Sequence, residues 1–458
     1  MDSASKIGIS RRAEYAELFR LGFPVLLTQL GVIVMSFTDT MMVGAYGVTE
    51  LAASAFVNSV FLIPMVMLSG LAAGLTPLVG ALFTRNNNHE VGRIARAGLQ
   101  INLIVGCIFT IVMTSLFFFL DRFGQAPEIL PSARSYYITM LTTIVPMALF
   151  NSLTQTSNGL TDTRTPMWFV LGAIVLNILG NWLLIFGHWG FPRMGLTGAG
   201  VATSIARAAG LIGIAIVYLR SKRYAPWRPG LLNPGKLAEE RRLVWRTSYP
   251  VMIQTGIECA LWSFGAVVCG WYGKIQLAAY QIVNTIGQLG FMTYMSFGVA
   301  VSIRVANFTG LGDEHAARMA VRAGLHLNML LATIASLLMA LCSRGLLSLF
   351  TPDTDVIAAG EALILPLVLY QYLDATQLTF MNAIRGTSQV KPLLWIALSC
   401  YVIIGVPILL LFAEVLRGEN VGVYYSFNVA LLCAAILGYL VFRRIRIAPP
   451  PAQSHSAQ

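Results

Sequence analysis

The chain contains PVLLTQLGVIVMSFTDTMMVGAYGVTELAA at Pro24–Ala53 and a related segment, PVMIQTGIECALWSFGAVVCGWYGKIQLAA, at Pro250–Ala279. The two segments align without a gap at an offset of 226 residues, and glycines such as Gly44 and Gly270 coincide. A repeat of about 20–50 residues would indicate a solenoid. A duplication of about half the chain, in apolar sequence, instead indicates a membrane transporter with two pseudo-equivalent halves.

The composition is typical of a membrane protein. Of its 458 residues, 56% are hydrophobic and 11% are charged, whereas charged residues make up about 25% of a soluble protein. Polar or turn-rich breaks separate apolar stretches that are longer than the ~18 residues needed to cross a bilayer as a helix. We therefore predict an all-α polytopic membrane protein with twelve transmembrane helices, at residues 15–44, 51–83, 94–120, 132–157, 165–188, 196–219, 241–271, 278–309, 317–341, 358–383, 391–414 and 420–442.

The net charge of +11 reports the orientation of these helices rather than a nucleic-acid partner. With both termini on one side of the membrane, the loops and span ends of that side carry 22 Lys and Arg residues, and those of the opposite side carry 6. Cytoplasmic loops of membrane proteins are enriched in Lys and Arg. We therefore expect a multi-pass protein of the inner (plasma) membrane with both termini in the cytoplasm, whose basic loops contact anionic lipids.

A long hydrophilic stretch divides the chain into halves of six predicted helices each. Because each half has an even number of spans, the two halves share one orientation, which makes the duplication parallel. The predicted organisation is two pseudo-symmetric six-helix bundles, with a cytoplasmic N-terminus at 1–14, an N-lobe at 15–219, a cytoplasmic linker at 220–240, a C-lobe at 241–442 and a cytoplasmic tail at 443–458.

Three acidic residues, Asp39, Glu258 and Asp374, lie inside predicted spans. A carboxylate within the membrane is costly and usually lines an interior cavity. Burial favours the protonated form of a carboxylate, which makes these residues candidates for proton exchange. With hydroxyl and amide oxygens nearby, they are equally suited to hold a small cation. The alternative is a structural role, in which each acid pairs with a buried arginine, Arg207 or Arg304.

Polar residues at helical spacing accompany these acids. Asn177 and Asn181 are four residues apart, so they share one face of a predicted helix. Their amide oxygens are suited to an ion near Asp39, and their amide groups are equally suited to hydrogen bonds between helices. Tyr370 is likewise four residues before Asp374, which places the phenol one turn from the carboxylate.

Gln281 and Asn284 form a polar patch on the predicted span 278–309. Amide side chains in the membrane usually bond helix to helix. On a face that lines a cavity they contact a substrate instead, and we include both residues among the candidate substrate contacts.

Two enzyme classes are disfavoured by the sequence. Gly310–Asp313 matches the GxGD pattern of intramembrane aspartyl proteases, but it lies outside the apolar run, so we interpret it as a turn. The chain contains no phosphate-cradling loop of the GxxxxGK[ST] type. An enzymatic function is therefore not expected, and transport would be driven by an ion gradient.

Two motifs resemble those of the multidrug and toxic compound extrusion (MATE) family. TDTMMVG at Thr38–Gly44 is similar to the family's first-span signature, and GLTDTRTP at Gly159–Pro166 is similar to its loop between spans four and five. The resemblance extends over Arg11–Arg446 and is greatest to the NorM branch, because Glu258 and Asp374 occupy the places of that branch's second-half acids. One departure is Asn181, which stands where some archaeal-type members have an aspartate.

The resemblance implies alternating access by two lobes, which export organic cations and other amphipathic compounds in exchange for Na⁺ or H⁺. It implies an ion-coupling site in each lobe and no cofactor, and we expect a monomer. The implied first-lobe site comprises Asp39, Asn177 and Asn181, and the implied second-lobe site, which is also the candidate for a monovalent metal ion, comprises Glu258, Tyr370 and Asp374. The implied substrate contacts are Asp39, Glu258, Asp374, Gln281 and Asn284. The alternatives are a flippase for lipid-linked precursors and an intramembrane hydrolase.

The chemistry of the two halves is not duplicated. At the offset of 226 residues Asp39 coincides with Gly265, Glu258 with Val32 and Asp374 with Ala148. The repeat therefore predicts a shared scaffold, and the acids predict a different role for each half.

Overall fold

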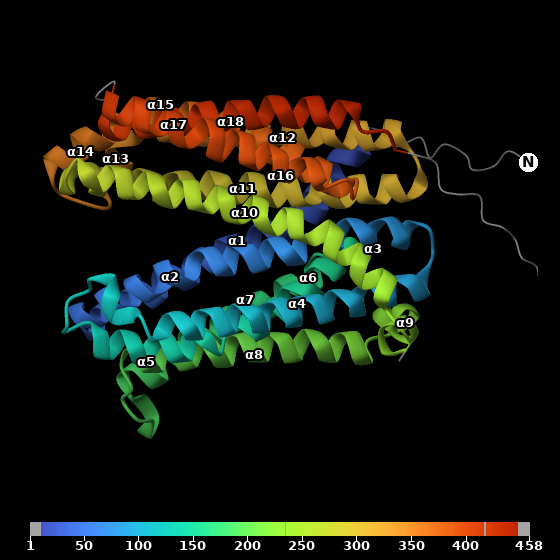
Figure 1. The fold of residues 1–458 in the computed structure, drawn as a ribbon, viewed down its shortest axis with the longest axis horizontal. Coiled ribbons are helices and arrows are strands. Elements are labelled where there is room, and N and C mark those ends of the chain that lie inside the picture. Colours follow the sequence, from blue (N-terminus) through green and yellow to red (C-terminus); the bar gives the residue numbers. More distant parts are fainter. Residues whose placement is uncertain (1–10, 234, 416–417, 448–458) are drawn as a thin grey trace, which may run out of the picture. The chain divides into compact units, whose positions relative to one another are not determined.

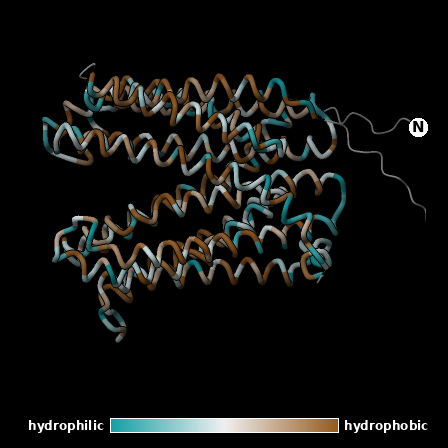
Figure 2. Tube along the Cα trace, viewed as in Figure 1, coloured by the Kyte–Doolittle hydropathy of each residue, from teal (hydrophilic) through white to brown (hydrophobic). Residues whose placement is uncertain are grey.

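The computed structural model describes residues 11–233, 235–415 and 418–447, and these residues form helices and connecting turns without a β-strand (Figure 1). Apolar residues fill the middle of the long helices, and hydrophilic residues gather at their ends and in the turns (Figure 2). The helices of the first half are α1 (Arg11–Tyr46), α2 (Val48–Ala73), α3 (Leu75–Thr84), α4 (Asn88–Phe117), α5 (Leu130–Leu141), α6 (Ile144–Gly159), α7 (Arg164–Phe186) and α8 (Leu196–Arg220).

The second half repeats this order with more interruptions. A bend of 47° separates α14 from α15, and the span after them includes π-helical turns at Leu398–Gly405 and Leu411–Val415. Its helices are α10 (Ala238–Trp271), α11 (Lys274–Leu311), α12 (Glu314–Leu341), α13 (Ser343–Ser348), α14 (Thr354–Glu361), α15 (Ile364–Gly386), α16 (Lys391–Ala397), α17 (Val406–Leu410) and α18 (Glu419–Arg444).

The prediction of an all-α polytopic protein with twelve spans is confirmed. Within the described residues, 11 helices are long and apolar enough to cross a membrane, and the bent pair of α14 and α15 makes 12. Two predicted spans are each built from two consecutive helices, α2 with α3 and α5 with α6. The sequence does not indicate these breaks, because the residues on either side are apolar and the span keeps its length.

The GxGD stretch is a turn between two helices, as interpreted from the sequence. Gly312 adopts a left-handed conformation (φ 72°) that ends α11, which a residue without a Cβ adopts at little cost. The Asp313 carboxylate then accepts a hydrogen bond of 2.9 Å from the Ala316 backbone N–H at the start of α12. An N-terminal cap of this kind satisfies a backbone donor that the helix leaves unpaired.

The chain folds into two compact units that exchange segments. Unit 1 comprises Met1–Leu26, Gly80–Asn86 and Ala260–Gln458, and unit 2 comprises Leu27–Val79 and Asn87–Cys259. The chain therefore passes from one unit to the other inside α1 and inside α10, not in the hydrophilic linker. The lobe boundaries of the sequence analysis follow the order of the spans and stay a prediction about lobes, whereas these units follow the contacts.

A buried glutamate fixes the first turns of α1 and α10, each within its own unit. In unit 1 the fully buried Glu14 accepts two hydrogen bonds from Arg304 of α11, at 2.8 and 2.7 Å. In unit 2 Glu240 accepts a hydrogen bond of 2.6 Å from Arg93 of α4. Glu14 and Glu240 occupy equivalent positions of the repeat, at the offset of 226 residues. Because an unpaired buried charge is costly, each pair holds the start of its helix in place.

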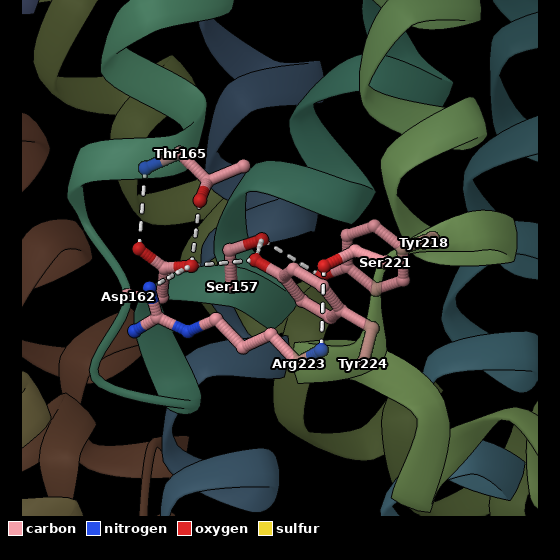
Figure 3. Close-up of polar contacts among 7 residues, drawn as sticks. All are labelled: Ser157, Asp162, Thr165, Tyr218, Ser221, Arg223 and Tyr224. Carbon is pink, nitrogen blue, oxygen red and sulfur yellow. Dashed lines mark hydrogen bonds and ion pairs between the residues drawn. The ribbon is translucent and has the colours of Figure 1, made fainter.

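The beginning of the linker is bound to unit 2 by a polar cluster around Asp162 (Figure 3). The linker contains a 3-10 helix, η3 (Lys222–Trp227), and α9 (Arg228–Leu232). The Asp162 carboxylate, 2% exposed, accepts hydrogen bonds from the Tyr224 hydroxyl (2.8 Å) and the Thr165 hydroxyl (2.7 Å) and lies 3.2 Å from the Arg223 guanidinium. Burial raises the pKa of the Tyr224 phenol, and the Asp162 charge adds to this, so the hydroxyl stays protonated and donates.

We expect Asp162→Asn to lower the free energy of unfolding by about 2 kcal/mol, because the neutral amide forms weaker bonds with these donors inside a buried site. Denaturant unfolding of the purified protein in detergent micelles measures the change. The matched control is Asp121→Asn, which removes the half-exposed ion pair of Asp121 with Arg134 and is expected to cost less than about 1 kcal/mol. Equal losses in the two variants would contradict the structural role of Asp162.

Candidate functional site

The predicted first-lobe residues come together in unit 2. Asp39 lies on α1 and is half-buried, and its Oδ1 accepts a hydrogen bond of 2.5 Å from the Asn181 Nδ2 on α7. The same Nδ2 lies 3.4 Å from the Asn177 Oδ1, one turn earlier on α7. Both asparagines are fully buried. The structure therefore places three of the predicted site residues, Asp39, Asn177 and Asn181, in one hydrogen-bonded group.

The close packing of α7 and α8 supports this group from behind. A Cβ added at Gly180 would lie 2.9 Å from the Ala202 Cβ, so only a glycine allows the two helices to approach this closely. The approach brings the Asn177 Nδ2 within 3.1 Å of the Thr203 Oγ1, to which it donates. This bond fixes the orientation of the Asn177 amide, whose oxygen is thereby directed toward Asn181.

One oxygen of the group has no protein partner. The Asn181 Oδ1 is buried and accepts no hydrogen bond from the described residues, while its amide nitrogen is engaged by Asp39 and Asn177. Buried polar atoms are almost always satisfied by protein, water or a ligand. A carboxylate beside an unsatisfied carbonyl oxygen is suited to a proton, a water molecule or a small cation.

Two further groups act on Asp39 electrostatically, and the sequence analysis assigned neither to this site. Tyr136 of α5 and Arg207 of α8 both interact with the Asp39 charge. The Tyr136 hydroxyl donates to the Asn58 Oδ1 of α2 at 3.3 Å. Arg207 had a signal in the sequence, as a charged residue inside a span. Tyr136 had none, because a single tyrosine in an apolar helix is usually a packing residue.

The second group of polar residues lies on α15 in unit 1. Asp374 is 1% exposed, and its charge acts on the Tyr294 hydroxyl of α11. Tyr294 donates a hydrogen bond of 2.9 Å to the Gln371 Oε1, one turn before Asp374. One turn after Asp374, the Gln377 Nε2 donates to the Tyr401 hydroxyl at 2.8 Å. Asp374 therefore lies within a buried polar stripe, of which the sequence analysis identified only Asp374 and Tyr370.

Tyr370 lies at one end of an aromatic group in unit 1. Its ring meets the Trp262 ring edge-on, with centroids 5.5 Å apart, and Trp262 packs against Phe427 with centroids 4.2 Å apart. The Phe427 ring fills the space beside Gly265, which is the repeat counterpart of Asp39. Unit 1 thus has aromatic rings at the position where unit 2 has a carboxylate.

Glu258 belongs to unit 2, one residue before the chain passes into unit 1. The Gln254 Nε2 donates a hydrogen bond of 3.0 Å to the Glu258 Oε2, one turn away on α10. Tyr370 and Asp374 belong to unit 1, so the predicted second-lobe set is divided between the units. Its role as an ion site stays a prediction.

Gln281 and Asn284 are exposed on α11, together with Thr285 and Gln288. These four residues follow the spacing of one helix face. The equivalent face of α2 includes Asn58, at the offset of 226 residues from Asn284, and it is exposed as well. Amide groups are costly in hydrocarbon. The two faces therefore suit water-filled surroundings, which is compatible with their prediction as substrate contacts.

A family model described as MatE matches residues 24–183 and 250–411 of this chain, which are the two copies of the repeat. The chain belongs to the MatE family. The resemblance identified from the Asp39 and Asp162 motifs is thereby confirmed, and the MatE protein is a multi-pass membrane protein.

Curated relatives and solved structures agree with this assignment. The MatE protein is 29% identical to the probable multidrug resistance protein NorM of Pseudomonas putida over 440 residues, covering 93% of this chain and 94% of the relative. It is 29% identical to the multidrug resistance protein PmpM of Pseudomonas aeruginosa over 409 residues, covering 88% and 84%. The fold is similar to that of the eukaryotic MATE transporter AtDTX14, with a TM-score of 0.86 at 18% identity, covering 95% of this chain and 96% of that one.

Proposed function

We propose that this MatE protein is a multidrug efflux antiporter of the inner membrane, which exports organic cations and other amphipathic compounds in exchange for Na⁺ or H⁺. The names of its relatives, multidrug resistance proteins, support efflux of drugs. The observation that carries antiport is the group in unit 2, where the Asp39 carboxylate lies beside the unsatisfied Asn181 Oδ1 inside membrane-spanning helices. A carboxylate in this setting binds a proton, Na⁺ or a cationic substrate, one at a time.

Competition for one carboxylate is sufficient for exchange. When the site faces outward, the coupling ion displaces the organic cation, and when it faces inward, the organic cation displaces the coupling ion. The differential affinity for the two ligands sets the direction of transport. Asp374, held in the buried polar stripe of unit 1, provides a second carboxylate of the same kind.

The test is ethidium transport in inverted membrane vesicles under an imposed Na⁺ gradient or an imposed pH gradient, each applied separately. We expect one of the two gradients to drive ethidium accumulation at a rate well above that of vesicles without the protein. An ionophore that collapses the gradient is the control and is expected to abolish accumulation. Absence of transport under both gradients would contradict antiport.

A further inference from the structure

We propose that Arg207 is a fixed counter-cation of Asp39, which lowers the affinity of the unit 2 site for transported cations and thereby permits their release. This inference rests on the proposed function, since it concerns the affinity of the same site for its cation. Arg207 lies on α8, eleven residues after Leu196 and thirteen before Arg220, near the middle of a span. A charged side chain at this depth is costly and is retained where it serves a function.

The contacts of Arg207 are with neutral groups. Its Nη1 donates hydrogen bonds to the Thr143 Oγ1 at 2.7 Å and to the Met65 Sδ at 3.3 Å. Within the described part of the chain, no carboxylate lies within 4 Å of its guanidinium. Hydrogen bonds from a hydroxyl and a thioether hold the side chain in place, but they leave its positive charge uncompensated.

The other arginines that are buried against the helices of their units are arranged differently. Arg304 forms two hydrogen bonds with Glu14, and Arg93 forms an ion pair with Glu240. In these pairs a carboxylate in direct contact neutralises the guanidinium. Arg207 therefore differs from Arg304, with which the sequence analysis grouped it, because the nearest acid acts on it from a distance.

That acid is Asp39. The two charges interact with each other, and both act on the Tyr136 hydroxyl. Asp39 itself makes its direct hydrogen bond with Asn181 and forms no ion pair within 4 Å in the described residues. The site thus contains one negative and one positive fixed charge that are close but not joined, and its net charge is zero.

This arrangement determines how strongly a cation is held. A cation at Asp39 is attracted by the carboxylate and repelled by the Arg207 guanidinium, and both forces are stronger inside a protein than in water. With the carboxylate alone, the cation would be bound tightly and released slowly. With Arg207 present, the carboxylate keeps a partial counter-charge after the cation leaves, so release is less costly.

The experiment measures the equilibrium binding of tetraphenylphosphonium, a monovalent lipophilic cation, to the purified full-length protein in lipid nanodiscs. We expect Arg207→Met to bind this probe on the order of tenfold more tightly than the wild type, since the repulsion is removed. Its rate of ethidium efflux is expected to fall at saturating substrate. Arg207→Lys keeps the charge, and its affinity is expected to remain within about threefold of the wild type.

Two controls separate charge from structure. Thr143→Val removes a hydrogen bond of Arg207 but keeps its charge, so it is not expected to tighten binding. Arg134→Gln removes an equal charge from unit 2 at the exposed pair with Asp121 and is expected to leave the affinity unchanged. Unchanged or weaker binding by a folded Arg207→Met variant would overturn the proposal, as would equal tightening by Thr143→Val. Absence of probe binding and ethidium efflux in the wild type would instead contradict the proposed function.

Discussion

Asp39→Asn is expected to abolish ethidium efflux, lowering its initial rate by at least about 100-fold. The amide has nearly the shape of the carboxylate but neither carries a charge nor exchanges a proton. Two unit charges about 4 Å apart attract each other by about 4 kcal/mol at an effective dielectric constant of 20, which exceeds what a 100-fold change requires. The hydrogen bond from Asn181 has a carbonyl acceptor in the variant as well, so we expect folding and expression to be retained.

The measurement is ethidium transport in inverted vesicles at matched protein levels. Thr40→Val is the matched control, because Thr40 is the next residue of α1, is exposed, and donates its hydroxyl hydrogen bond to the Ser36 backbone. This control is expected to transport at a rate near that of the wild type. Full efflux by Asp39→Asn would remove Asp39 from the mechanism and with it the main support for antiport at unit 2.

Asp374→Asn is expected to have an effect of similar size for a different reason. Asp374 is buried in unit 1 among amide and hydroxyl groups, beside Gln371 and within electrostatic range of Tyr294. A change from carboxylate to amide removes the charge from the polar stripe of α15, which then has no group able to balance a cation. We expect efflux to fall at least about 100-fold, by the same Coulomb estimate.

Asp355→Asn is the control for unit 1, since Asp355 is an exposed acid in the first turn of α14. It is expected to leave efflux unchanged. Binding of tetraphenylphosphonium distinguishes the roles of the two acids. If Asp39 holds the organic cation and Asp374 the coupling ion, only Asp39→Asn loses the probe. Normal efflux by Asp374→Asn would show that the acid of unit 1 has a structural role.

The helices themselves were predictable from the sequence because crossing a membrane imposes a simple requirement. A span needs about 20 consecutive apolar residues, and no other element satisfies its backbone in hydrocarbon. The repeat, with Pro24 and Pro250 at the same offset, fixed the number of spans in each half and their orientation. Breaks such as the one between α5 and α6 were not predictable, because they change the direction of the backbone without a change in hydropathy.

The functional residues were predictable only where they violate this requirement. Asp39 and Asp374 were conspicuous as charges in apolar sequence, and Asn177 and Asn181 as amides at helical spacing. Tyr136 and Thr203 satisfy the ordinary rules for a spanning helix. They join the site only because α5 and α8 pack beside α7, and the sequence does not specify which faces of separate helices meet.

The exchange of segments between the units shows the same limit. The sequence alone determined a parallel duplication, its spans and the unpaired acids, since hydropathy and charge are properties of single residues. Only the tertiary structure decided that α1 and α10 each begin in the unit opposite to their remainder, that Glu14 rather than Asp39 pairs with Arg304, and that Arg207 acts on Asp39 from a distance. Pairings between helices depend on packing in three dimensions, where residues far apart in the chain become neighbours.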